Sequence, residues 1–160
     1  MRVDHGGIPP LFDKESRALI LGTMPSPKSR EAAFYYAHPQ NRFWRVLAAI
    51  LGENCPETAE GRAALCHRRH IALWDVLASC EIEGAADSTI RAPEPNDIAG
   101  LLKQAPIRAV FTTGTTATKL YQRLLPVLPR AIPLPSTSPA NCRIRFEELV
   151  ERYRVILNYL

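Results

Sequence analysis

The chain has 160 residues, of which 46% are apolar and 22% are charged. This composition excludes intrinsic disorder, and the length suits one compact domain, which we assign to residues 1–160. Lysine and arginine number 20 against 16 aspartate and glutamate, and the net charge of +4 is compatible with a polyanionic partner.

The longest uncharged stretch, residues 131–142, is interrupted by prolines, so no membrane span is expected. The N-terminal segment lacks the apolar core of a secretory signal. The four cysteines form no C-x-x-C pair, which favours reduced thiols over a disulfide framework or an iron–sulfur cluster. We therefore expect a cytoplasmic protein.

Short apolar runs alternate with amphipathic segments along the chain. In residues 41–51, for example, Phe43, Val46, Leu47 and Ile50 fall on one helical face. The patterns predict a strand at 18–21, helices at 41–51 and 56–68, a strand at 70–77, a helix at 95–104 with Asn96 as its N-cap, a strand at 107–113, a helix at 116–125, a strand at 131–134 and a helix at 143–157.

Strands that alternate with helices favour a parallel sheet covered by helices on both faces. In such sheets ligands bind beyond the carboxyl ends of the strands. The segments expected to carry function are therefore 22–41, 75–87, 114–118 and 135–141.

The first of these segments combines a glycine turn, hydroxyls, a cation and aromatic rings. Gly22 permits a sharp turn and a close approach of the backbone to a ligand. An aromatic ring beside an amide side chain suits a planar heterocycle, because the ring stacks and the amide both donates and accepts. The alternative is that the aromatics fill a core and Asn41 caps the following helix. The candidate ligand contacts here include Pro25, Ser26, Lys28 and Ser29.

A second segment, residues 134–141, places three consecutive hydroxyl residues between prolines and ahead of a helix. Hydroxyls, free backbone N–H groups and a helix dipole favour a phosphate. The alternative is an ordinary loop with an asparagine cap. The candidate contacts are Pro135, Ser136, Thr137, Ser138, Pro139, Asn141 and, just after them, Arg143.

Other polar residues carry weaker signals. Cys66, His67 and His70, with Cys80 later, are possible zinc ligands, but their spacing matches no common site, and we assign no metal. Asp75, at the end of the second strand, is either a cleft-lining carboxylate or a loop cap. The phosphate-binding and dinucleotide-binding glycine motifs and the G-x-S-x-G elbow are all absent.

Four motifs together resemble the uracil-DNA glycosylase superfamily, and most of all its hypoxanthine-DNA glycosylase branch. They are Leu19-Ile-Leu-Gly-Thr-Met-Pro-Ser26, Tyr35-Tyr-Ala-His-Pro-Gln-Asn-Arg-Phe-Trp44, Ala72-Leu-Trp-Asp-Val76 and Leu134-Pro-Ser-Thr-Ser-Pro-Ala-Asn141. The resemblance implies an α/β fold, a three-layer α/β/α sandwich around a four-stranded parallel sheet.

The resemblance also implies roles for residues. Several branches carry Asn or Asp where this chain has Met24, whereas the hypoxanthine branch relies on the asparagine that corresponds to Asn41. Tyr36 corresponds to the aromatic that stacks on the flipped base, and residues 134–141 to the loop that pinches the DNA backbone. The base-binding residues are expected to be Gly22, Thr23, Met24, Tyr36 and Gly114.

These features lead to an expected activity. We expect a monomeric DNA glycosylase that releases hypoxanthine from deoxyinosine without a metal or organic cofactor. Because no lysine is obviously placed for a Schiff base, we expect the enzyme to be monofunctional, without lyase activity. The alternatives are a mismatch-specific uracil glycosylase and, given Met24, a DNA-binding relative without activity. A small-molecule hydrolase is a further class, which the missing nucleophile elbow disfavours.

Overall fold

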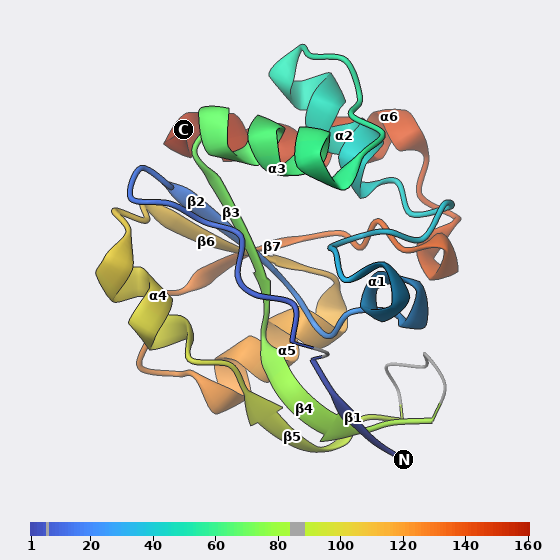
Figure 1. Cartoon of the computed structure of the whole chain (residues 1–160), viewed down its shortest axis with the longest axis vertical. Coiled ribbons are helices and arrows are strands. Elements are labelled where there is room, and N and C mark those ends of the chain that lie inside the picture. Colours follow the sequence, from blue (N-terminus) through green and yellow to red (C-terminus); the bar gives the residue numbers. More distant parts are fainter. Residues whose placement is uncertain (6, 84–88) are drawn as a thin grey trace.

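A computed structural model describes residues 1–5, 7–83 and 89–160 (Figure 1). At its centre is a four-stranded sheet in the order β3-β2-β6-β7, in which every neighbouring pair is parallel. The strands are β2 (Ala18–Gly22), β3 (Ile71–Asp75), β6 (Ala109–Thr113) and β7 (Ala131–Leu134). The predicted four-stranded parallel sheet is confirmed.

Helices cover both faces of this sheet, which completes the three layers (Figure 1). One face carries α2 (Phe43–Leu51), α3 (Ala59–Arg68) and α6 (Phe146–Tyr153), and the other carries α4 (Ile98–Gln104) and α5 (Thr115–Leu124). The alternation of side chains along β2 builds both cores. Ile20 packs in the core below α2 and α6, and Leu21 packs in the core with α4 and α5.

A second, antiparallel sheet was not predicted. It consists of β1 (Arg2–Asp4), β4 (Leu77–Glu81) and β5 (Arg91–Pro95) in the order β1-β4-β5. The prediction of one strand over 70–77 is therefore wrong, since the chain leaves the parallel sheet at Asp75 and β4 pairs elsewhere. This sheet could not be predicted from the sequence, because β1 has only three residues and β5 contains two prolines.

Several helix ends also differ from the predictions. Asp97, not Asn96, caps α4, and its carboxylate accepts a hydrogen bond from Gly100 N at 3.0 Å. The predicted final helix over 143–157 is shorter, because α6 starts at Phe146 and is followed by the 3₁₀ helix η3 (Arg154–Tyr159). The short helix α1 (Pro27–Ala32) was missed, although Ser26 at its N-cap and Pro27 in its first turn are typical start signals. None of the described helices is long and apolar enough to cross a membrane.

Candidate active site

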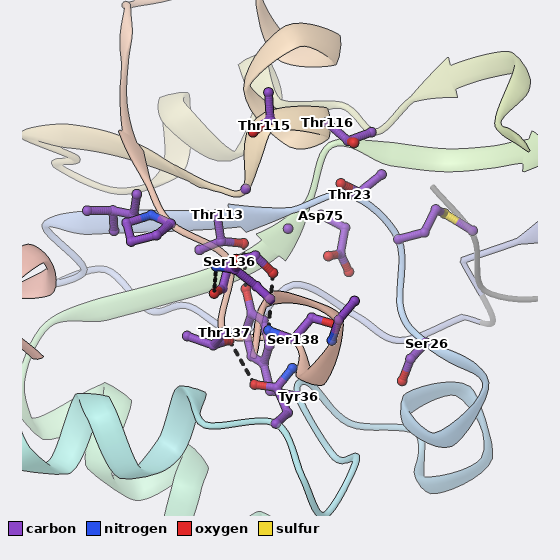
Figure 2. A pocket seen from close by; sticks show the side chains of 18 of the residues that line it. Thr23, Ser26, Tyr36, Asp75, Thr113, Thr115, Thr116, Ser136, Thr137 and Ser138 are labelled. Atoms are coloured by element: carbon purple, nitrogen blue, oxygen red, sulfur yellow. Dashed lines mark hydrogen bonds between the residues drawn. The ribbon is translucent and has the colours of Figure 1, made fainter. Parts of the chain in front are cut away.

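A cleft of about 990 Å³ opens at the carboxyl ends of the parallel strands (Figure 2). Its walls are the segments that follow β2, β6 and β7, together with Asp75 at the end of β3. The expected ligand segment 75–87 continues into residues 84–87, which lie outside the described residues. The cleft brings together most of the predicted site residues, namely Gly22, Thr23, Met24, Pro25, Ser26, Ser29, Tyr36, Asn41, Gly114, Pro135, Ser136, Thr137, Ser138 and Asn141.

Three of the predicted DNA-binding residues do not line this cleft. Lys28 is exposed on α1 and lies 3.8 Å from Glu31. Pro139 begins the 3₁₀ turn η2 (Pro139–Asn141) and borders a separate, shallow hollow that also includes Arg45. Arg143 is exposed beyond that turn.

Asn41 lies where two loops meet. Its Oδ1 accepts hydrogen bonds from Phe43 N at 2.9 Å and from the Thr137 hydroxyl at 2.8 Å. A backbone N–H can only donate, so the oxygen of the amide must face Phe43. The N-cap of α2 is Arg42 rather than Asn41, but the Asn41 amide binds the first backbone N–H of the helix and also lines the cleft. With its oxygen occupied, the group has N–H donors left to offer.

Arg42 joins the same two loops, although it is not among the predicted site residues. Its backbone N donates to Thr137 O at 3.1 Å, and its guanidinium donates to Ile144 O at 2.7 Å and Asn141 O at 3.0 Å. The five N–H donors of arginine suit such carbonyl clusters. The segment that carries Asn41 and residues 137–144 thus form one unit. The arginine within the Asn-Arg-Phe-Trp string was the available signal.

Tyr36 adopts a left-handed backbone conformation with φ 53°, which is uncommon for a residue other than glycine. Its ring stacks on Phe43 with centroids 3.9 Å apart, and its hydroxyl lies 3.5 Å from Thr113 Oγ1. Ser29 stabilises the bend because its Oγ accepts a hydrogen bond from Ala37 N at 3.1 Å. Burial raises the Tyr36 pKa well above its usual range, so the phenol stays neutral.

Gly22 and Asp75 approach each other closely at the floor of the cleft. A Cβ atom on Gly22 would lie 2.6 Å from Asp75 Oδ1 and 3.4 Å from the Tyr36 hydroxyl. The φ angle of Gly22 is not in the left-handed region, so close approach, rather than the predicted sharp turn, explains this glycine. Of the two interpretations of Asp75, the structure favours the cleft-lining carboxyl.

Asp75 has a partner that sequence analysis missed. His5 Nε2 lies 2.8 Å from Asp75 Oδ2, and both side chains are buried. Burial raises the Asp75 pKa above its usual range, and the hydrogen bond and charge of His5 offset part of that rise. His5 precedes the sheet by more than ten residues and belongs to no recognised motif, so nothing in the sequence linked it to Asp75.

Hydroxyl groups and the N-terminus of α5 form another part of the cleft wall. Gly114 caps α5 with φ 93°, and a Cβ there would lie 3.3 Å from Ser136 Cβ. Gly114 N donates to Leu134 O at 2.8 Å, which holds the β6 and β7 loops together. Thr137 is 1% exposed and Ser29 is 3% exposed, so their hydroxyls are engaged within the protein. Ser136 and Ser138 retain partial exposure in the cleft wall.

The candidate zinc ligands are not brought together. Cys66 is buried in the core below α2, where burial raises its pKa to about 12, and Cys80 is buried in the core on the other face of the sheet. His67 instead pairs with Asp13 at 3.1 Å. Within the described ranges, no cluster of three or more His, Cys, Asp or Glu side chains is placed to hold a metal.

Comparisons with known proteins agree with this architecture. The chain is similar to two proteins named hypoxanthine DNA glycosylase. It is 35% identical to that of Methanosarcina acetivorans over 86% of this chain and 88% of the relative, and 38% identical to that of Methanosarcina barkeri over 68% and 70%. A solution NMR structure from Methanosarcina acetivorans, described as a candidate uracil DNA glycosylase, superposes with a TM-score of 0.79 at 33% identity and covers 98% of this chain and 99% of that one. The model of the uracil DNA glycosylase superfamily matches residues 9–157, and the chain belongs to that superfamily.

Proposed function

We propose that this protein is a monofunctional DNA glycosylase that takes a deaminated base out of the DNA stack and releases hypoxanthine by hydrolysis of the N-glycosidic bond. Membership of the superfamily and the names of the two Methanosarcina relatives support the reaction and the base. The observation that carries the proposal is the placement of Asn41, whose amide lines the cleft and is held by Thr137.

Base extrusion precedes chemistry, because the glycosidic bond is inaccessible inside the stack. The flipped base enters the cleft and stacks against the ring of Tyr36, whose other side is supported by Phe43. Gly22, Thr23, Met24 and Gly114 form the surrounding wall of the base pocket. The loop over 135–138 and the start of α1 contact the phosphates through Ser136, Ser138 and Ser26.

Asn41 acts on the reacting sugar and base through its amide N–H groups. The glycosidic bond breaks with oxocarbenium character on the sugar, so positioned dipoles that stabilise the departing base lower the barrier. The occupied Oδ1 leaves Asn41 as a donor to the base or to the attacking water. An amide does not abstract a proton at neutral pH, so the contribution of Asn41 is orientation and electrostatics.

Cations at the rim complement the phosphate backbone of DNA. Arg30, Lys119 and Arg152 line the cleft from three different helices. Each neutralised phosphate adds salt-dependent affinity without reading the sequence. A single copy of the chain supplies all of these groups, and we propose that the protein acts as a monomer.

A panel of labelled duplexes tests this proposal. Each duplex carries one deoxyinosine, deoxyuridine or deoxyxanthosine lesion, and alkali reveals abasic sites after a single turnover. Hypoxanthine release by the wild type that is lost in Asn41→Ala is the expected result. Release of uracil alone would move the substrate to that of the mismatch-specific glycosylases. Binding to all duplexes without any release would instead favour the DNA-binding relative that Met24 suggests.

A further inference from the structure

Asp75 is the one carboxylic acid among the described residues that line the cleft. Its side chain is 6% exposed, and Figure 2 shows its carboxyl directed into the cleft. A carboxyl group that is this buried needs a reason, because transfer of a charge out of water is costly. None of the roles proposed so far for the cleft residues uses this carboxyl group.

The surroundings of Asp75 hold its carboxyl in one orientation. Oδ2 lies 2.8 Å from His5 Nε2, and Asn96 Nδ2 donates to the backbone oxygen of Asp75 at 3.0 Å. Oδ1 has no hydrogen-bond partner among the described residues. It lies over Gly22 and has room there because glycine has no side chain. One oxygen is thus bound to the protein and the other is available to a ligand.

The two tyrosines of the cleft are poor proton donors near neutral pH. Burial raises the pKa values of Tyr35 and Tyr36 far above their usual range. The same burial raises the pKa of Asp75, which brings a carboxyl closer to the pH at which a general acid is effective. An amide such as Asn41 transfers no proton. A perturbed carboxyl in a cleft is a candidate for acid catalysis.

We propose, on the premise that the proposed function holds, that Asp75 is the general acid of the reaction and protonates the departing purine. As the bond between C1′ and N9 breaks, its electron pair stays with the base, and the proton on Oδ1 moves to N7. Hypoxanthine leaves as a neutral tautomer. Water then adds to C1′ and releases one proton, which restores the acid form of Asp75. His5 is a positioning residue that holds Oδ2.

A substrate that needs no proton tests this role. In a duplex with 7-methyl-2′-deoxyinosine, N7 already carries a methyl group and the base leaves without protonation. Single-turnover rates are measured on this duplex and on the deoxyinosine duplex, after subtraction of the rate without enzyme. Asp75→Asn keeps the shape of the side chain but cannot donate a carboxyl proton. Its rate on deoxyinosine should fall about 10²- to 10⁴-fold, and its rate on the methylated base less than about 10-fold.

Asp13→Asn is the matched control, because Asp13 also pairs with a histidine, His67, but lies outside the cleft. It should release both bases at wild-type rates. His5→Gln should reduce deoxyinosine cleavage more than cleavage of the methylated base. Circular dichroism and thermal melting show whether each variant folds.

Equal losses of Asp75→Asn on the two substrates would overturn the acid role, as would a wild-type rate on deoxyinosine. A wild type that releases neither base would refute the proposed function and this inference together. Release of hypoxanthine by the wild type, with no preference of Asp75→Asn for the methylated base, would refute this inference alone.

Discussion

The amide oxygen of Asn41 accepts a hydrogen bond from the Thr137 hydroxyl at 2.8 Å, which joins two loops 96 residues apart in the chain. One loop carries the proposed catalytic amide, and the other is the proposed phosphate-binding loop. The buried hydroxyl of Thr137 is engaged by this contact, so we expect a shift of residues 135–138 on DNA binding to change the position of Asn41. We therefore expect phosphate contact and catalysis to be linked through this hydrogen bond.

Removal of either partner should lower the rate through the same contact. We expect Asn41→Ala to lose about 10- to 1000-fold in single-turnover cleavage of deoxyinosine. Thr137→Val, which keeps the volume of the side chain, should lose about 10-fold, because a misplaced amide reacts poorly. The double variant should be no slower than Asn41→Ala, since contacting residues are not additive.

Thr58→Val is the control for stability. Thr58 caps α3, its Oγ1 accepts a hydrogen bond from Gly61 N at 3.0 Å, and it is not among the residues that line the cleft. It should lower stability by about 1 kcal/mol with little change in rate. If the rate losses of Asn41→Ala and Thr137→Val are additive in the double variant of these two residues, Thr137 does not act through Asn41.

Gly22→Ala should impair both stability and activity. The new Cβ would lie 2.6 Å from Asp75 Oδ1, so the buried carboxyl or β2 must shift. We expect a loss of about 1–3 kcal/mol, as for other overpacked sites, measured by denaturant unfolding. The double variant Gly22→Ala/Asp75→Ala removes the clash and should recover most of the stability but little activity. If Gly22→Ala and the double variant are equally unstable, the loss of stability does not come from the contact between the new Cβ and Asp75.

Stability should depend on pH through Asp75. Because its folded pKa is raised above the ordinary value of 3.8, the folded state favours the protonated carboxyl. This contribution is complete below pH 3.8 and is lost as pH rises through the raised pKa. The facing groups are His5 and the phenols of Tyr35 and Tyr36, of which the phenols stay neutral across this range.

Thermal melts between pH 4 and 8 measure this effect. Relative to the wild type, Asp75→Asn should gain in melting temperature as pH rises, because it never acquires the buried charge. The same series in a His5→Gln background separates the contribution of Asp75 from that of its histidine partner. A constant difference between wild type and Asp75→Asn across this range would argue that Asp75 does not titrate in the folded protein.

The absence of lyase activity can be tested at Lys119. No lysine is predicted from the sequence to form a Schiff base, but Lys119, which is exposed on α5, lies among the residues that line the cleft. We assign it to phosphate contact. Borohydride should trap no covalent complex with deoxyinosine DNA, and Lys119→Ala should weaken DNA binding and reduce the salt slope by about one. A trapped adduct that disappears in Lys119→Ala would make the enzyme a lyase.

Much of the central sheet was predictable because its strands are short and mostly apolar. All five residues of β2 are buried, and a short run of this kind in an α/β fold is typical of a strand at the centre of a parallel sheet. The site loops followed from the rule that ligands bind at the carboxyl ends of parallel strands. The small antiparallel sheet was not predictable, since the partners of β4 are a three-residue strand and a strand with two prolines.

The long-range contacts that support the cleft could not be predicted from the sequence, for a different reason. His5 meets Asp75 across 70 positions, and Arg42 meets Ile144 across 102. Neither contact leaves a periodic pattern, because each depends on how two loops are brought together by the sheet. Asp75 could be placed at a strand end but given no role until its burial and its partner were known.

The most direct test of the central claim is the identity and rate of the base released from a deoxyinosine duplex. Mass spectrometry of the free base, alongside single-turnover quantification of abasic strand, should show stoichiometric hypoxanthine with the wild type and a rate at least about 10-fold lower with Asn41→Ala. Hypoxanthine released equally by both proteins would remove Asn41 from the mechanism. A wild type that binds the duplex but releases no hypoxanthine would contradict the assigned function itself.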